Sequence, residues 1–144
     1  MAAAEPAAKL SRERMDALVD GHFRAEEAGD VDAIVDGFIP EAEHDAAGRP
    51  GGPLRGGEQI AGFYRARLAE LRIDRFETVR RWYGADHVVD ESILHGTAAG
   101  RPFGFEGRGR TVRVRLLHVF DFEHGRISRE SAWIERSALE QQLG

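Results

Sequence analysis

The stretch TVRVRLLHVFDF, residues 111–122, alternates between two kinds of side chain with almost no interruption. A period of two is typical of a β-strand that buries one face. The row expected to be buried is apolar with one exception: Val112, Val114, Leu116, His118, Phe120 and Phe122. A histidine in such a row is either a hydrogen-bonded core residue or the polar group of a pocket.

The same strand predicts a hairpin with residues 127–135, because EHGR between them is typical of a turn. Counting outward from a two-residue turn at 124–125 places His118 opposite Ser131. Paired residues share a face of the sheet. The face of His118 then also carries three side chains that suit a ligand site: Arg129, Ser131 and Trp133.

Three helices are expected before the strands. Residues 9–28 place apolar side chains and His22 on one helical face. AGD at 28–30 ends this helix and offers Asp30 as the N-cap of a second helix. Residues 58–71 form the third helix, EAEHDA predicts a short strand, and the rest reads as antiparallel strands. The order predicts an α+β fold, and 144 residues suit one domain over 1–144.

Composition excludes several classes of function. The absence of cysteine excludes disulfides, thiolate metal sites and a cysteine nucleophile. A net charge of −5 and the lack of a long apolar run give no reason to expect nucleic acid or membrane partners. The start of the chain lacks the apolar run of a signal peptide, so a cytoplasmic protein is the default expectation. Neither metal-binding histidine spacing nor a nucleotide-binding glycine motif occurs, so no metal or other cofactor is expected.

Several segments together resemble a known family. A long helix ending in AGDVDAIVDGF, a helix with GEQIAGFY and strands ending in HVFDFEHGRISRESAWIE are similar to the nuclear transport factor 2-like superfamily. Within it the chain resembles most the SnoaL-like polyketide cyclases and ketosteroid isomerases, over roughly residues 9–140. The resemblance implies a cone-shaped α+β barrel, with three N-terminal helices packed in a curved antiparallel sheet and a pocket between them.

The resemblance also places candidate catalytic residues. The long-helix tyrosine of ketosteroid isomerases falls at His22, their strand aspartic acid at His118 and their general base at Ala46. The pair His44-Asp45 looks like a pair that is frequent in the SnoaL-like branch. Because neighbours along a strand face opposite sides, only one of these two can face the pocket.

These observations predict an enzyme that performs cofactor-free acid–base chemistry on a small, mostly apolar carbonyl compound, such as a polyketide-like substrate. The reaction would be a cyclisation, an isomerisation or a dehydration. Imidazole suits this chemistry because it can take and give a proton near neutral pH. His118 would be the acid–base group, His22 its hydrogen-bonding partner, and His44-Asp45 the second proton-transfer group. The expected ligand-binding residues are Arg129, Trp133, Tyr64, Phe63 and Ser131.

Some points stay open on the sequence alone. Arg129 either binds a carbonyl or anionic ligand or pairs with an acid such as Glu91, because an unpaired inward arginine costs too much. The absence of a base at Ala46 leaves room for a non-catalytic ligand-binding or interaction domain. A limonene-type epoxide hydrolase would need an inward Asp-Arg-Asp set, and its expected acid near the chain end is Ala132. Outward Leu117 and Val119 predict a homodimer.

Overall fold

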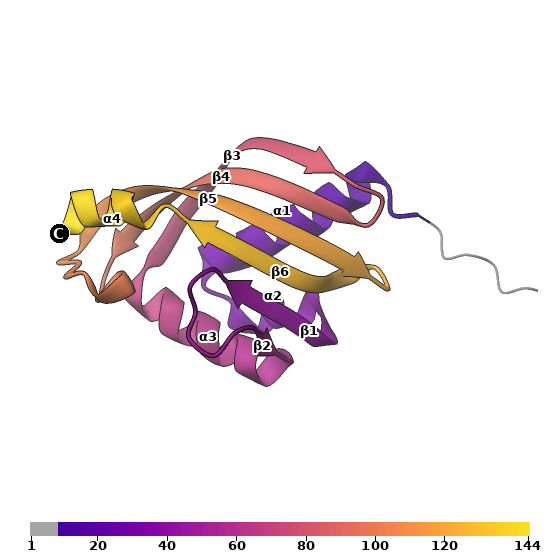
Figure 1. The fold of residues 1–144 in the computed structure, drawn as a ribbon, viewed down its shortest axis with the longest axis horizontal. Helices are drawn as coiled ribbons and strands as arrows, with labels where there is room; N and C mark the ends of the chain where they lie inside the picture. The colour runs from indigo at the N-terminus through magenta and orange to yellow at the C-terminus, as the bar shows by residue number, and fades with distance from the viewer. Residues whose placement is uncertain (1–8) are drawn as a thin grey trace, which may run out of the picture.

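A computed structural model of the chain describes residues 9–144, which form four α-helices, six strands and a short 3-10 helix (Figure 1). In chain order the elements are α1 (Arg12–Ala28), α2 (Val31–Asp36), β1 (Phe38–Ala46), β2 (Leu54–Arg55), α3 (Gly57–Glu70), β3 (Arg72–Tyr83), β4 (His87–Ala98), η1 (Pro102–Gly104), β5 (Arg110–Glu123), β6 (Arg126–Ile134) and α4 (Arg136–Leu143).

Local sequence signals set the ends of the first two helices. The Ser11 side chain accepts a hydrogen bond of 3.1 Å from the backbone N–H of Arg14, which caps the start of α1. Gly29 ends α1 in the left-handed conformation with φ of +67°. Asp30 then caps α2 by accepting a 3.1 Å bond from the N–H of Ala33. The break predicted at AGD is confirmed.

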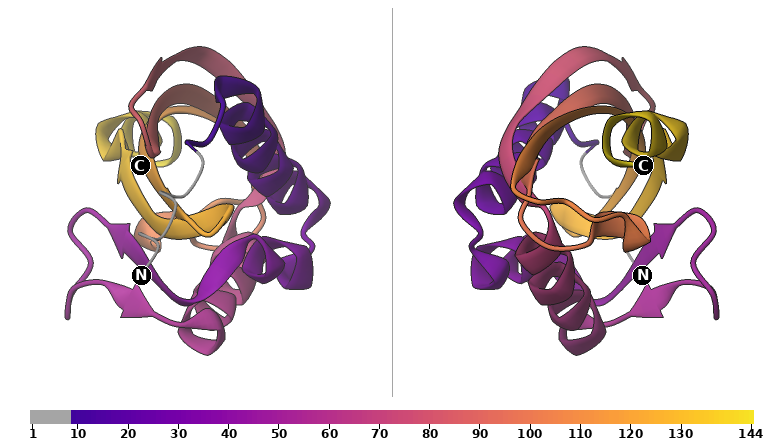
Figure 2. Two further views of the ribbon diagram at one scale, coloured as in Figure 1. Left: turned by 90° about the vertical axis from the view of Figure 1, so that its right-hand side faces the viewer. Right: turned by 90° about the vertical axis from the view of Figure 1, so that its left-hand side faces the viewer.

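The six strands form one curved sheet in the order β2-β1-β6-β5-β4-β3. All neighbouring strands are antiparallel except β1 and β6, which run parallel. The sheet does not close, and Figure 2 shows it curling around, with α1 and α3 on its inner side. The predicted α+β cone is confirmed, with a mixed sheet in place of a wholly antiparallel one. β1 precedes α3 in the chain, joins the sheet beside the last strand, β6, and runs parallel to it.

The predicted register of the β5–β6 hairpin is wrong by one residue along most of its length. The turn is where the sequence places it, and Phe122 pairs with Ile127. Asp121 then pairs with Arg129, so Ser128 is left over as a bulge in β6. An extra residue on one strand exchanges its inward and outward side chains. Beyond Ser128 the residues that face inward are therefore Glu130, Ala132 and Ile134.

The interior holds two groups of packed apolar side chains. The first joins α1, α2 and α3 to β1 and to the turn end of the β5–β6 hairpin, with Val19, Ile34 and Phe120 fully buried. The second lies under the far ends of β3, β4 and β5 and is closed by Leu139 and Leu143 of α4. α4 begins two residues after β6 ends and is not among the elements expected from the sequence. A cavity is lined by members of both groups.

Candidate functional site

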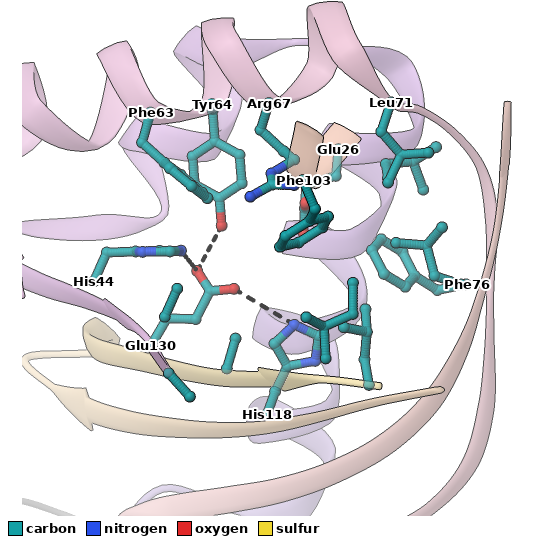
Figure 3. A pocket seen from close by; sticks show the side chains of 17 residues that line it. Glu26, His44, Phe63, Tyr64, Arg67, Leu71, Phe76, Phe103, His118 and Glu130 are labelled. Atoms are coloured by element: carbon teal, nitrogen blue, oxygen red, sulfur yellow. Dashed lines mark hydrogen bonds and ion pairs between the residues drawn. The ribbon is translucent and has the colours of Figure 1, made fainter. Parts of the chain in front are cut away.

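The cavity lies between α3 and the inner face of the sheet, with about 650 Å³ of empty space including its open mouth. Its apolar wall is made by side chains from β3 to β6 and the end of α3: Leu71, Ile73, Phe76, Leu94, Leu116 and Ile134. Its polar part consists of Glu26, His44, Tyr64, Arg67, His118 and Glu130 (Figure 3). Apolar walls with a few converging polar groups are typical of small-molecule sites.

Glu130 of β6 is at the centre of the polar part and is only 2% exposed. Its carboxylate accepts a hydrogen bond of 2.6 Å from the Tyr64 hydroxyl. The Nε2 atoms of three histidines surround the same carboxylate: His22 at 3.3 Å, His44 at 3.5 Å and His118 at 3.7 Å. Burial alone raises the pKa of Glu130, but the charge and hydrogen bond of His22, with smaller effects of His44 and His118, outweigh it and lower that pKa strongly. The carboxylate is therefore ionised.

His22 of α1 is a buried cation between two carboxylates. Its Nε2 lies 3.1 Å from Glu26 Oε2 and 3.3 Å from Glu130 Oε1. Burial alone lowers the pKa of His22, but Glu130 and then Glu26 outweigh it and raise that pKa to about 10. The ring carries a proton at neutral pH, which balances one of the two buried negative charges.

His44 of β1 has the opposite protonation state. The Arg49 guanidinium donates to the His44 carbonyl at 2.5 Å and approaches His44 Nδ1 at 2.9 Å. A guanidinium has only donors, so Nδ1 is the acceptor and the ring proton is on Nε2, which faces Glu130. Burial, outweighing the effect of Glu130, lowers the pKa of His44, and Arg49 adds to the decrease. His44 is a neutral imidazole that offers one N–H.

His118 of β5 lines the cavity beside Glu130, with its ring stacked at 5.3 Å on Phe120. Its Nε2 is 3.7 Å from Glu130 Oε1, which is longer than a hydrogen bond. Its Nδ1 is buried and, like Nδ1 of His22, has no hydrogen-bond partner among residues 9–144. A structural core histidine normally has its polar atoms bonded. The contacts of His118 therefore do not match a fully hydrogen-bonded core residue.

The structure divides the predicted site residues into two groups. His22, His44 and His118 come together around Glu130, and Tyr64 and Phe63 line the same cavity, with the Phe63 ring 4.4 Å from the His44 ring. The remaining predicted residues lie on the outer face of the sheet: Asp45, Arg129, Ser131 and Trp133.

For Arg129, Ser131 and Trp133 the outward position is a correction with one physical cause, the bulge at Ser128. Asp45 faces outward because its neighbour on β1, His44, faces the cavity. Arg129 forms ion pairs with Glu43 and, at 2.9 Å, with Asp45, and it donates to the Ser131 hydroxyl. It is paired, but with β1 rather than with Glu91. Trp133 is 48% exposed and borders a different, shallow depression.

Glu130, Arg67 and Glu26 line the cavity but are not among the residues predicted from the sequence. One signal for Glu130 was available: Ile127 and Ile134 both suit the core, yet an odd separation of seven places them on opposite faces of a regular strand. A bulge between them removes the conflict and turns Glu130 inward. Glu26 is one helical turn from His22, a spacing that allows pairing but does not require it.

Two further arrangements of charged groups bear on the chemistry of the site. His22, Glu26 and Glu130 have ligand atoms within 4.8 Å of one another, close enough to hold a metal ion. Such an ion would have to displace the His22 proton, which both carboxylates stabilise. An Asp-Arg-Asp set also exists, because Arg81 contacts Asp90 and Asp16, but neither it nor these two acids line the cavity.

Among residues 9–144, no helix is both long enough and apolar enough to span a membrane. Comparison with curated protein sequences finds no match. A family model described as SnoaL-like domain matches residues 19–130, which include His22, His44, His118 and Glu130.

Many solved structures share the fold. TsrD from Streptomyces laurentii has a TM-score of 0.80 and 23% identity, covering 94% of this chain and 98% of that one. A candidate polyketide cyclase from Xanthomonas campestris pv. campestris has a TM-score of 0.76 and 21% identity, covering 92% and 96%. An LEH-like epoxide hydrolase from M. tuberculosis has a TM-score of 0.71 and 16% identity, covering 91% and 90%. At these identities the likeness is one of fold.

Proposed function

The chain belongs to the SnoaL-like domain family, and from this premise we propose that it is an enzyme of cofactor-free acid–base chemistry. Its substrate would be a small, mostly apolar carbonyl compound, such as a polyketide-like molecule. Cyclisation, isomerisation and dehydration of such compounds can all begin with loss of a proton from the carbon beside the carbonyl. The observation that carries the proposal is an ionised carboxylate, Glu130, surrounded by three imidazoles on the wall of an apolar cavity.

In this proposal His118 is the proton carrier. Glu130 lies beside Nε2 of His118, which favours the tautomer with its proton on Nε2 and a free electron pair on Nδ1. Nδ1 has no protein partner among residues 9–144, so it can take the proton from carbon after a small rotation of the ring. His118 then returns the proton at another carbon or to a leaving hydroxyl.

His44 would stabilise the negative charge that develops on the carbonyl oxygen. Because Arg49 occupies Nδ1, the ring keeps its Nε2–H and does not become charged near neutral pH. A neutral N–H donor that is fixed before the reaction lowers the energy of an enolate without reorganisation. The ring is held against Phe63, which restricts its orientation.

His22 and Tyr64 would act on Glu130 rather than on the substrate. Tyr64 donates to Glu130, and the His22 cation lies beside the same carboxylate. Together they hold the carboxylate in place and keep it ionised, so its field on His118 is constant. The apolar wall excludes water, which strengthens each of these interactions.

Exchange of carbon-bound protons tests the proposal without a known substrate. A panel of small cyclic ketones and β-keto esters in D2O, followed by NMR, should show enzyme-dependent exchange at the carbon beside the carbonyl. His118→Gln should lower the exchange rate by about 10² to 10⁴, the scale of losing a general acid or base. His87→Gln, at a histidine on the surface, is the matched control and should exchange like the wild type. Binding without exchange by the wild type would instead favour a non-catalytic ligand-binding domain.

We also propose that the chain forms a homodimer through the outer face of its sheet. Leu117 and Trp133 are paired neighbours on β5 and β6 and are 37% and 48% exposed, with Val119 on the same face. Exposed apolar side chains grouped on one face are typical of an interface. Light scattering should give about twice 16.0 kDa, and a mass near 16.0 kDa would refute the proposal.

A further inference from the structure

Arg67 of α3 lines the cavity on the wall opposite Glu130 and His118 (Figure 3). Its guanidinium is 4.0 Å from the centre of the Phe103 ring and 5.6 Å from that of Phe63. Aromatic faces stabilise a cation but accept no conventional hydrogen bond from it. Arg67 is thus held in position with its donors left for another group.

Other partly buried arginines have polar partners. Arg81 contacts three aspartates, Arg129 contacts two acids, and Arg49 contacts His44. Among residues 9–144, no carboxylate oxygen lies within 4.0 Å of the Arg67 guanidinium, and Glu26 and Glu70 act on it only from farther away. Burial, followed by the charge of Arg49, lowers the pKa of Arg67. A negative group in the cavity would offset both effects.

The residue that covers Arg67 is itself held in an uncommon backbone conformation. Phe103 has φ of +54° in η1, which is rare for a bulky residue. Such a conformation persists only where the surroundings impose it, and ligand sites are frequent examples. Here it places the Phe103 ring over the guanidinium at the edge of the cavity.

We propose that Arg67 is the anchor for a carboxylate on the substrate, which makes the substrate an apolar carbonyl compound that is also a carboxylic acid. A planar guanidinium matches a carboxylate with two parallel hydrogen bonds. With the carboxylate on α3, the body of the substrate lies across the cavity toward His118 and Glu130. This inference rests on the proposed function and specifies its substrate class.

A pair of isosteric probes tests the anchor without the natural substrate. Cyclohexanecarboxylate and cyclohexanecarboxamide have the same shape, but only the first is charged. Calorimetric titration at pH 7 should show that the wild type binds the carboxylate about 10- to 100-fold more tightly than the amide. Arg67→Gln should abolish this preference. Arg65→Gln, an exposed arginine on the same helix, should keep it.

Two further measurements keep the test decisive. In the wild-type protein the Arg67 Nε–H signal in NMR should shift with the carboxylate and not with the amide, which requires no variant. His118→Gln should keep the preference while losing carbon–proton exchange. Equal affinity for the two probes, binding of neither at millimolar concentration, or a preference that survives Arg67→Gln would overturn the anchor. If the wild type catalyses carbon–proton exchange but binds both probes equally, only the anchor is refuted. If it prefers the carboxylate but catalyses no exchange, only the proposed enzyme activity is refuted.

Discussion

Two charged side chains, Arg81 and Glu130, each hold together a cluster of ionisable groups, and the two clusters differ in their partners. Arg81 of β3 is 8% exposed at its side chain and contacts three aspartates: Asp16 at 2.8 Å, Asp20 at 2.6 Å and Asp90 at 2.7 Å. Glu130 is 2% exposed and is surrounded by histidines and a tyrosine. We call them the Arg81 cluster and the Glu130 cluster.

The Arg81 cluster joins one guanidinium to three carboxylates, and none of these groups is a histidine. Burial alone lowers the pKa of Arg81, but the three aspartates outweigh it and raise that pKa further. Two of its acids, Asp16 and Asp20, are on α1 and are more than one third exposed. The cluster therefore fastens α1 to β3 and β4.

The Glu130 cluster can change its protonation state, because each histidine has a different environment. His22 is charged, His44 is neutral and the carboxylate is ionised. Groups whose environments move their pKa values apart are typical of acid–base sites. Both clusters combine burial with charge, so these two properties alone do not single out a candidate catalytic site. Histidine partners, whose ordinary pKa is near neutral, and an adjoining apolar cavity distinguish the Glu130 cluster, whereas Arg81, Asp16 and Asp20 border an open surface depression.

The largest expected effect comes from Glu130→Gln, which keeps the shape of the side chain and removes its charge. His22 loses one of its two anions, so the free energy of unfolding should fall by about 3–5 kcal/mol, the range for breaking a buried pair. Carbon–proton exchange should fall by about 10² to 10⁴ because His118 loses its orienting group. Urea unfolding and NMR exchange on one preparation measure both quantities.

Glu43→Gln is the control for this substitution, since Glu43 pairs with Arg55 and Arg129 on the outer face. A partly exposed pair contributes about 0–1 kcal/mol, and exchange should stay at the wild-type rate. If Glu130→Gln kept the wild-type rate of carbon–proton exchange, the Glu130 cluster would have no role in the chemistry and would not differ from the Arg81 cluster in this respect.

The next largest effect is expected for Arg81→Met, and it should be confined to stability. Asp90 is fully buried and, among residues 9–144, would keep only Ser92 as a partner, so the free energy of unfolding should fall by about 3 kcal/mol. Carbon–proton exchange should remain within about twofold, since Arg81 and Asp90 are not in the cavity lining. A loss of exchange as large as that of Glu130→Gln would mean that the clusters act as one unit.

Much of the fold could be predicted because its signals are local. Helix ends depend on caps such as Asp30, and the inward row of β5 depends only on alternation. For the same reason His22 and His118 could be placed inside from their own segments. His22, His44 and His118 could therefore be chosen as candidate site residues without knowing that they surround Glu130.

The rest depends on relations between segments that a sequence pattern does not contain. The single extra residue, Ser128, decides whether Arg129 or Glu130 is inside, and both are charged, so the cost of burial does not choose between them. The site of Arg67 depends on η1, a loop segment far from α3 in sequence. The odd separation of seven residues between Ile127 and Ile134, two side chains that both suit the core, is the local clue to the bulge.

The smallest expected effect is a dependence of stability on pH that belongs to the Glu130 cluster alone. His22 has an ordinary pKa of 6.5 and a pKa of about 10 in the folded protein. The folded state therefore binds the proton more strongly than the unfolded state. The stability from His22 is complete below about pH 6.5 and is lost as the pH rises toward 10. One proton gives a slope of at most about 1.4 kcal/mol per pH unit.

The Arg81 cluster has its slope at the opposite end of the pH scale. Burial alone raises the pKa of Asp16, but hydrogen bonds from Tyr83 and Arg81 outweigh it and lower that pKa below 3.8. Its stabilisation is present above that value and is lost only in acid. Urea unfolding at pH 7, 8 and 9 should therefore show falling stability in the wild type and in Arg81→Met, and a flat profile in His22→Gln. If His22→Gln kept the wild-type slope between pH 7 and 9, another group would be titrating there, and His22 would not be the cation that balances Glu130.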